Sequence, residues 1–189
     1  MEFVDVIKKR ASVRKYASKV PEMESVIAAI EAAHLAPSPG NLDILRYLII
    51  ENKETIKQIA DACQQTFIEE APILVVIYSD SKQVLKMYDK RAEKYIRQHA
   101  GAAIENFLLA ITDMGMSSCW VGAFSDPMVH NILNIPDNIT VEAILPVGYE
   151  HKASHTIQRK KFSLDRKIHY HKYGNIFRIK IPQVRRTDI

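Results

Sequence analysis

The sequence predicts an α+β domain built around a mostly antiparallel or mixed sheet. Apolar side chains recur at helical spacing in several segments, and the continuous apolar run Ile73–Tyr78 indicates a strand buried on both faces. Val141–Tyr149 is predicted as another strand. Helices and strands alternate, but not as βαβ units of fixed length. No internal repeat or Gly/Ser linker divides the 189 residues, which predicts one domain over residues 1–170 and a C-terminal extension over 171–189.

In the first half of the chain, Phe3, Val6 and Ile7 recur at helical spacing and predict a short helix over residues 2–10. The same pattern predicts a helix over 22–35. Two prolines and a glycine within Ala36–Asn41 then exclude a continued helix. A strand over Tyr47–Ile50 and a helix over 53–64 are expected to follow.

The second half is expected to alternate in the same way. After the strand at 73–78, a charged helix is predicted over 82–97 and a core helix over 98–114, ended by Gly115. Ser118–Phe124 is predicted as a strand or strand-like segment. Asp126 is the expected N-cap of a helix over 127–133, because Pro127 suits the first helical position. The last strand is predicted over 141–149.

Composition excludes several classes of protein. Apolar residues make up 47% and charged residues 25%, which excludes a disordered chain. Two cysteines, Cys63 and Cys119, are too few for a disulfide framework and are expected to be reduced and buried. No apolar stretch approaches the roughly 18 residues of a membrane span, and no signal peptide is recognisable, so a cytoplasmic location is expected. The net charge of +4 is small and argues against nucleic-acid binding.

Two basic clusters could bind one anion. Arg10 and Arg14 are four residues apart with the Ser12 hydroxyl between them, a set that can converge on a tetrahedral anion. The alternative is a solvated basic helix end. Arg159, Lys160 and Lys161 form the second cluster, for which the alternative is an exposed loop.

Two further segments could face a flat ligand. The Ser38 hydroxyl and the Asn41 amide could contact a planar polar molecule, although the loop could also be an ordinary turn. Gly122 permits close approach of the backbone to a ligand, and the neighbouring Trp120 could be either core or platform. The sequence contains no hydrolytic set, no zinc-ligand spacing and no glycine-rich phosphate loop.

Taken together and in order, these segments resemble the flavin-dependent nitroreductase family. The resemblance covers about residues 3–170. It rests on Arg10-x-Ser12-x-Arg14, on Pro37-Ser38-x-x-Asn41, on Ala102–Ala110, on Gly115 and Ser118–Phe124, on Leu133-x-Ile135-Pro136, and on Ala143–Tyr149.

The resemblance implies an FMN-dependent oxidoreductase of nitroreductase fold, an intertwined homodimer with two flavins at the subunit interface. Hydride would pass from NAD(P)H through flavin N5 to a small acceptor, so the flavin rather than a protein residue carries the chemistry. No membrane, nucleic-acid or metal partner is implied. The implied cofactor-binding residues are Arg10, Ala11, Ser12, Arg14, Arg159 and Lys161 around the phosphate and ribityl chain; Pro37, Ser38, Pro39 and Asn41 toward the flavin of the other subunit; and Val121 and Gly122 beside N5.

Three departures from the family pattern bear on activity. Asp43, Ile44 and Leu45 replace a frequent Gln-Pro-Trp, Gln98-His99 replaces a common Gln-Asp, and Thr66 stands near an often basic position. The family also includes dehalogenating and flavin-degrading branches. A non-catalytic module that binds a nucleotide or nucleic acid through the same basic clusters is the alternative from another class; it predicts no NAD(P)H oxidation.

Overall fold

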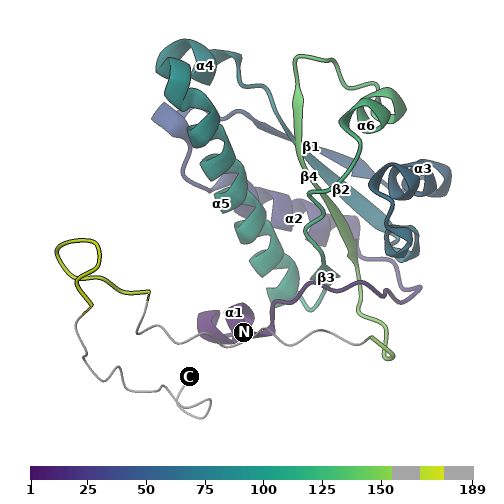
Figure 1. Ribbon diagram of the computed structural model, residues 1–189. Coiled ribbons are helices and arrows are strands. Elements are labelled where there is room, and N and C mark those ends of the chain that lie inside the picture. The colour runs from purple at the N-terminus through teal and green to yellow at the C-terminus, as the bar shows by residue number, and fades with distance from the viewer. Residues whose placement is uncertain (155–166, 177–189) are drawn as a thin grey trace. The chain divides into compact units, whose positions relative to one another are not determined.

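The computed structural model describes residues 1–154 and 167–176 (Figure 1). The chain divides into one unit over Met1–Thr156 and a second over Ile157–Ile189. In the second unit, residues 167–176 form a turn in which the Tyr170 amide donates to the Asn175 carbonyl at 2.9 Å. The predicted boundary at residue 170 and the packing of the extension on a partner stay predictions.

The first unit is organised around a four-stranded sheet in the order β1-β2-β4-β3. The strands are β1 (Leu45–Ile50), β2 (Ile73–Ser79), β3 (Ser117–Ser118) and β4 (Thr140–Gly148), and every neighbouring pair is antiparallel. The predicted α+β class is confirmed. Sequence alone left open a mixed sheet, whereas the pairings between these four strands are antiparallel only.

The two faces of the sheet carry separate apolar clusters. Because side chains alternate along a strand, Ile73, Val75 and Ile77 of β2 pack on one face with α2 (Met23–His34) and α5 (Ala92–Asp113). Leu74 and Val76 pack on the other face. That face is covered by α3 (Lys53–Cys63) and α6 (Asp126–Leu133), so the sheet lies between two helical layers (Figure 1).

The helices of the first half agree with prediction to within one or two residues. The opening helix α1 spans Phe3–Lys9, and α2 and α3 lie within their predicted ranges. Asn52 caps α3, because its side-chain oxygen accepts from the Thr55 amide at 2.9 Å. Strand β1 begins at Leu45, two residues before the predicted Tyr47. The short 3-10 turns η1 (Pro39–Asn41) and η2 (Thr66–Glu70) were not expected from sequence.

The predicted helix boundary between residues 97 and 98 is wrong. Helix α4 spans only Lys82–Tyr88, nine residues short of the predicted end, and the 3-10 turn η3 (Asp89–Arg91) follows it. Helix α5 then continues without a break for 22 residues. The chain turns at Asp89, whose φ is +44°. Ala92 and Ile96 are buried and extend the apolar face of Ala100 and Ala103, so packing joins the two predicted segments into one helix.

Two other boundaries also differ from prediction. The Ser118–Phe124 strand shrinks to Ser117–Ser118, and pairing resumes only at Val121, opposite Ile144. Cys119 and Trp120 interrupt the ladder in between. Helix α6 begins at Asp126, so its N-cap is Ser125 rather than Asp126. None of the helices within residues 1–154 and 167–176 is long and apolar enough to span a membrane.

Candidate active site

The segment Arg10–Arg14 leaves α1 as an extended chain beside β3. Ser12 pairs with Ser118 in a parallel bridge, and the Val13 amide donates to the Ser118 carbonyl at 3.1 Å. Val13 is buried in the core, whereas Ser12 and Arg14 are exposed. Successive side chains of an extended chain point to opposite sides. Because Val13 points into the core, Ser12 and Arg14 both point away from it, on the same side of the segment.

The polar side chains of this segment gather around Cys119. Burial raises the pKa of the Cys119 thiol, and Arg14, a hydrogen bond with Ser12 and Arg10 each oppose that rise. The guanidinium groups of Arg10 and Arg14 and the hydroxyl of Ser12 therefore all lie near the Cys119 thiol. The neighbouring Ser118 hydroxyl is buried and has no hydrogen-bond partner within the described residues. Such a set can bind an oxyanion, because it offers two guanidinium groups and hydroxyl donors together.

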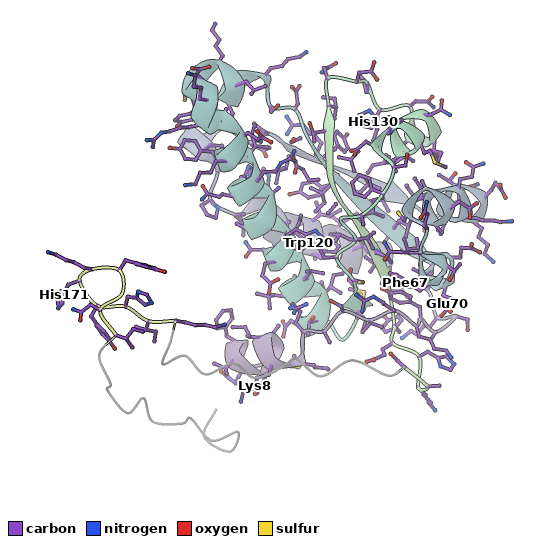
Figure 2. The ribbon with its side chains drawn as sticks, in the orientation of Figure 1. Lys8, Phe67, Glu70, Trp120, His130 and His171 are labelled. Carbon is purple, nitrogen blue, oxygen red and sulfur yellow. The ribbon has the colours of Figure 1, made fainter. Side chains whose placement is uncertain are left out.

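Both arginines are also held by other elements. The Arg10 Nε lies 3.3 Å from the Glu105 Oε1 of α5, and the Arg10 side chain is mostly buried. The Arg14 guanidinium lies 5.8 Å from the ring centroid of Phe67 in η2 (Figure 2 labels Phe67). Exposed Thr66 begins the same turn. Sequence reasoning did not assign Glu105 or Phe67 to the site. Glu105 lies within the Ala102–Ala110 motif, but nothing local in the sequence indicates its contact with Arg10, and Phe67 belongs to no motif.

The Pro37–Asn41 loop is pressed against α4. Gly40 and Asn41 both have left-handed backbones, with φ of +59° and +58°. A Cβ at Gly40 would lie 2.7 Å from the Tyr88 hydroxyl, so both the left-handed backbone and the limited space favour glycine at this position. The loop conformation is therefore fixed by a contact with α4 that the sequence motif does not contain.

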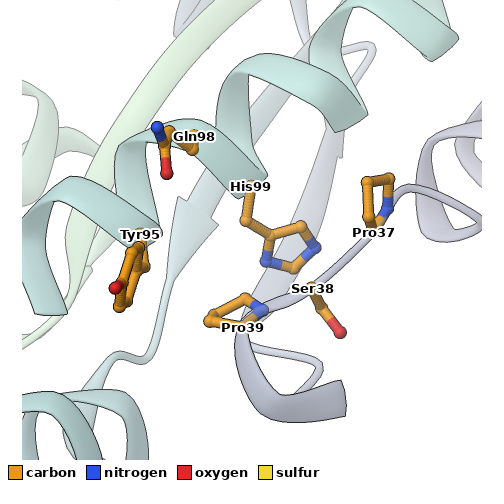
Figure 3. Close-up of a pocket in the computed structure, with 6 residues that line it drawn as sticks. All are labelled: Pro37, Ser38, Pro39, Tyr95, Gln98 and His99. Atoms are coloured by element: carbon orange, nitrogen blue, oxygen red, sulfur yellow. The ribbon is translucent and has the colours of Figure 1, made fainter.

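A pocket of about 260 Å³ separates this loop from α5. It is lined by Pro37, Ser38 and Pro39 from the loop and by Tyr95, Gln98 and His99 from the helix (Figure 3). The His99 ring extends from α5 toward Ser38 and Pro39 in this view. His99 is only 4% exposed, and its Nδ1 has no hydrogen-bond partner among the described residues. Asn41 is exposed and does not line the pocket.

Burial lowers the pKa of His99 from its usual range. Asp43 and Glu142 act in the opposite direction, and His34 adds to the lowering. The neutral imidazole is therefore the favoured form, with one nitrogen donating and the other accepting. Tyr95, Gln98 and His99 follow helical spacing beside the Pro-Ser loop, and that spacing is the signal by which sequence could have found the pocket.

Val121 and Gly122 differ in what their backbones can offer. The Val121 amide donates to the Ile144 carbonyl at 3.0 Å, and the Val121 carbonyl accepts from the Ile144 amide. Gly122 is exposed beside Trp120, whose Nε1 would lie 3.7 Å from an added Cβ. The Val121 amide is thus committed to the sheet, which leaves Gly122 as the better donor to a ligand.

The predicted residues form two groups within one chain. Arg10, Ser12 and Arg14 meet the Ser118–Gly122 segment, and Arg10 contacts α5 at Glu105. Pro37–Pro39 meet α5 at residues 95–99. His99 precedes Glu105 by six residues, which is about 9 Å along a helix axis. Arg159 and Lys161 lie outside the described residues.

The structure also explains one departure from the family pattern. Ile44 and Leu45 are buried in the core rather than in the pocket. Exposed Asp43 lies 3.3 Å from the Arg46 Nη1 and 3.7 Å from the His34 Nδ1. Within the described ranges, no three metal-ligating side chains form a cluster. Among the departures, only Gln98 and His99 therefore line the pocket.

Comparison with known proteins agrees with this geometry. The model of the nitroreductase family matches residues 7–70 and 61–149. A protein of Archaeoglobus fulgidus, provisionally named an NADH dehydrogenase/NAD(P)H nitroreductase, is 30% identical over 155 residues, 78% of this chain and 85% of the relative. The iodotyrosine deiodinase of Thermotoga neapolitana is 27% identical over 161 residues, 77% of this chain and 87% of the relative.

The fold is found in a solved structure as well. An FMN-dependent nitroreductase from Clostridium difficile R20291 superposes with a TM-score of 0.76 at 22% identity, covering 90% of this chain and 99% of that one. Sequence and fold thus lead to one assignment. The chain belongs to the nitroreductase family of oxidoreductases.

Proposed function

We propose that this chain is an FMN-dependent oxidoreductase that uses NAD(P)H to reduce a small electron acceptor in the cytoplasm. The observation that carries the proposal is the convergence of Arg10, Ser12 and Arg14 on Ser118 and Cys119 at the end of β3. A flavin phosphate is a dianion that two guanidinium groups and hydroxyl donors suit. The residues present therefore fit the cofactor that the family resemblance implies.

The residues of the first group would hold the phosphate and ribityl chain of FMN. Arg10, already oriented by Glu105, and Arg14, placed over Phe67, supply positive charge, and Ser12 supplies a hydroxyl. The Ser118 hydroxyl, which has no hydrogen-bond partner among residues 1–154 and 167–176, is a further donor beside them. Ala11 contributes backbone. Arg159 and Lys161 are proposed to complete this set.

When bound, FMN would supply the two-electron redox chemistry, and the protein would supply orientation and electrostatics. The Gly122 amide is proposed to donate to the flavin edge near N5, because the Val121 amide is committed to Ile144. A backbone donor there would favour the more negative, reduced state of a ring nitrogen.

A second copy of the chain is proposed to complete the site. Pro37, Ser38, Pro39 and Asn41 would then reach the flavin bound mainly by the partner. Exposed apolar side chains support association: Phe3 of α1 is 68% exposed, Leu35 after α2 is 81% and Trp120 is 42% (Figure 2 labels Trp120). Large exposed apolar groups of this kind favour a protein interface over solvent.

The test is reconstitution of the purified full chain with FMN. We expect a yellow protein with one FMN per chain, a dimer by sedimentation, and oxidation of NADH or NADPH in the presence of a quinone or nitroaromatic. Because a deiodinase is among the relatives, the acceptor panel includes 3-iodotyrosine. A colourless protein that takes up no added FMN, or one that oxidises neither nucleotide, contradicts the proposal.

A further inference from the structure

The net charge of the chain is concentrated in one basic segment, residues 82–97, which forms α4, η3 and the start of α5 (Figure 1). The whole sequence has 26 basic and 22 acidic residues, a formal excess of +4. The basic segment contains six of the basic and two of the acidic residues, so the rest of the chain balances at 20 of each. Its cations are all exposed: Lys82, Lys86, Lys90, Arg91, Lys94 and Arg97.

Most of this positive charge is not neutralised by the fold. Arg97 forms an ion pair with Glu142, whose carboxylate is nearly buried. A hydrogen bond with Tyr95 raises the pKa of Arg91, and a neutral phenol leaves the guanidinium charge in place. The four lysines form no ion pair within residues 1–154 and 167–176. The basic segment therefore presents its charge to solvent.

Exposed apolar side chains lie among these cations. Leu85 of α4 is 50% exposed and Met87 is 58% exposed. Helix α4 is held in place beneath them, because Val84 is fully buried and the Tyr88 ring packs edge-on against Tyr95 with 5.0 Å between centroids. A fixed surface that combines apolar and charged side chains is typical of protein interfaces. Binding of nucleic-acid strands relies instead on exposed aromatic side chains, and both tyrosines here are half-buried against each other.

A second copy of the chain does not suit this surface. Helix α5 has 22 residues and is about 33 Å long. The Met1 amino group of the α1 segment pairs with Asp113 at the far end of α5, at 2.6 Å, so the apolar face of α1 lies away from the basic segment. A symmetric contact between two basic segments would bring like charges together. A partner of opposite charge is therefore favoured.

The basic segment is also adjacent to the loop that is expected to face the flavin. A Cβ at Gly40 in that loop would lie 2.7 Å from the Tyr88 hydroxyl and 3.1 Å from the Met87 sulfur, so α4 lies directly against the loop. Helix α4 has only seven residues, about 10 Å of helix. Such a surface suits the small interface, below roughly 1,200 Å², of a transient redox complex.

We propose that the basic segment docks an acidic electron-carrier protein, which accepts electrons that the enzyme takes from NAD(P)H. The lysines attract the carboxylates of the partner and accelerate the encounter, and Leu85 and Met87 supply apolar contact. The inference rests on the proposed function, because the electrons reach the partner only through the bound flavin.

The electrons balance with the proposed reductant alone. One NAD(P)H loses two electrons and a proton and becomes NAD(P)⁺. Two molecules of a one-electron carrier, such as a ferric haem protein, each gain one electron and become ferrous. The proton is released to solvent, and no covalent bond forms between the two proteins.

Cytochrome c is the probe, because succinylation of its lysines reverses its charge while the haem is retained. Reduction of succinylated and native cytochrome c by the FMN-loaded full chain and NADH or NADPH is compared without oxygen, so that superoxide carries no electrons. At low ionic strength we expect the succinylated form to be reduced about tenfold faster at equal concentration. The ratio should approach one near 1 M salt, where the screening length is about 3 Å.

Charge reversal on the enzyme tests where the probe docks. The Lys90→Glu, Lys94→Glu double variant should lose the preference for succinylated cytochrome c, and its reduction of a neutral quinone should stay at the wild-type rate. The Lys53→Glu, Lys57→Glu double variant makes the same charge change at two exposed lysines of α3 and should keep the preference.

The apolar contact is tested separately. Leu85→Gln should raise the KM for succinylated cytochrome c by about threefold to fivefold, because an apolar side chain is lost from the interface. Met128→Gln changes a similarly exposed apolar side chain on α6 and should leave this KM unchanged. A thermal melt identifies any variant that fails to fold, and the charge-reversal pair then still decides.

Three outcomes overturn the inference: equal or faster reduction of native cytochrome c by the wild type, loss of the preference in the α3 double variant, or tighter binding of a mixed-sequence DNA duplex than of succinylated cytochrome c. If FMN binds and quinones are reduced without a preference between the cytochromes, only this inference fails. If the chain binds no FMN, the proposed function fails, while sedimentation of the apoprotein with each cytochrome still shows whether the basic segment selects the acidic one.

Discussion

The backbone of Ser12 pairs with that of Ser118, and the Val13 amide donates to the Ser118 carbonyl at 3.1 Å. This pairing joins the Arg10–Arg14 segment to the strand that leads to Gly122. Two motifs from opposite halves of the chain thereby become one surface. This strand contact, together with the Arg10–Glu105 pair and the stacking of Arg14 over Phe67, sets the position of the cations relative to the Gly122 amide.

Arg14 is the first residue to test. Arg14→Glu should weaken FMN binding by about 10- to 100-fold, because a charge-assisted contact worth about 1.5–3 kcal/mol is replaced by repulsion. The melting temperature of the apoprotein should change little, since Arg14 is exposed. Lys15→Glu makes the same charge change at the next exposed position and should leave FMN affinity nearly unchanged. Equal FMN affinity in wild type and Arg14→Glu would refute the phosphate assignment.

Two buried hydroxyls should respond oppositely to removal. The Ser79 Oγ donates to the Glu142 Oε1 at 2.7 Å, so Ser79→Ala should lower the free energy of unfolding by about 1–3 kcal/mol. Ser118→Ala removes a buried hydroxyl without a partner among the described residues, so the apoprotein should be equally or more stable. FMN affinity should fall only in Ser118→Ala. Denaturant unfolding and FMN titration measure the two effects, and a large loss of apoprotein stability in Ser118→Ala would show a missed partner.

Two glycine-to-alanine substitutions should change the stability of the fold in opposite directions. A Cβ at Gly148 would lie 2.9 Å from the Tyr16 Cδ1 and 3.0 Å from the Pro72 Cδ, so Gly148→Ala should destabilise the fold by about 1–3 kcal/mol through overpacking. At Gly101, inside α5, an added Cβ would meet only Trp120, at 4.0 Å. Gly101→Ala should therefore stabilise the helix by about 0.5–1 kcal/mol. Chemical denaturation should rank the two variants on opposite sides of wild type.

Stability should depend on pH through His99. Burial lowers the pKa of His99, so the unfolded chain takes up this proton at a higher pH than the folded chain does. The stabilisation is complete above the unfolded pKa of about 6.5 and is lost as pH falls through the lowered folded value. Relative to His99→Leu, the wild type should thus lose stability between roughly pH 7 and pH 5. Parallel pH profiles of the two proteins would contradict this assignment.

The sequence was most informative where a signal is local. The apolar periodicity of α1, α2 and α3, the run Ile73–Tyr78 and the turn formers of Ala36–Asn41 each depend on neighbouring residues, and these elements agree with prediction to within one or two residues. The prediction of helix boundaries failed where packing against a segment distant in the sequence determines them. The predicted helix boundary at 97–98 was wrong because Ile96 and Ala100 are buried in one apolar cluster with residues of α2. The residues next to 97–98 in the sequence do not show that α2 will pack there.

The sequence by itself determined the residue types of the candidate site: two arginines around a serine, a Pro-Ser loop and a glycine beside a tryptophan. Only the tertiary structure decided their surroundings. It committed the Val121 amide to Ile144 and held Arg10 with Glu105. It also buried His99 beside Ser38 and Pro39, with no partner for its Nδ1 in the part of the chain that the structure describes. The physical reason is that burial and hydrogen-bond pairing depend on atoms contributed by distant segments, which come together only when the chain folds.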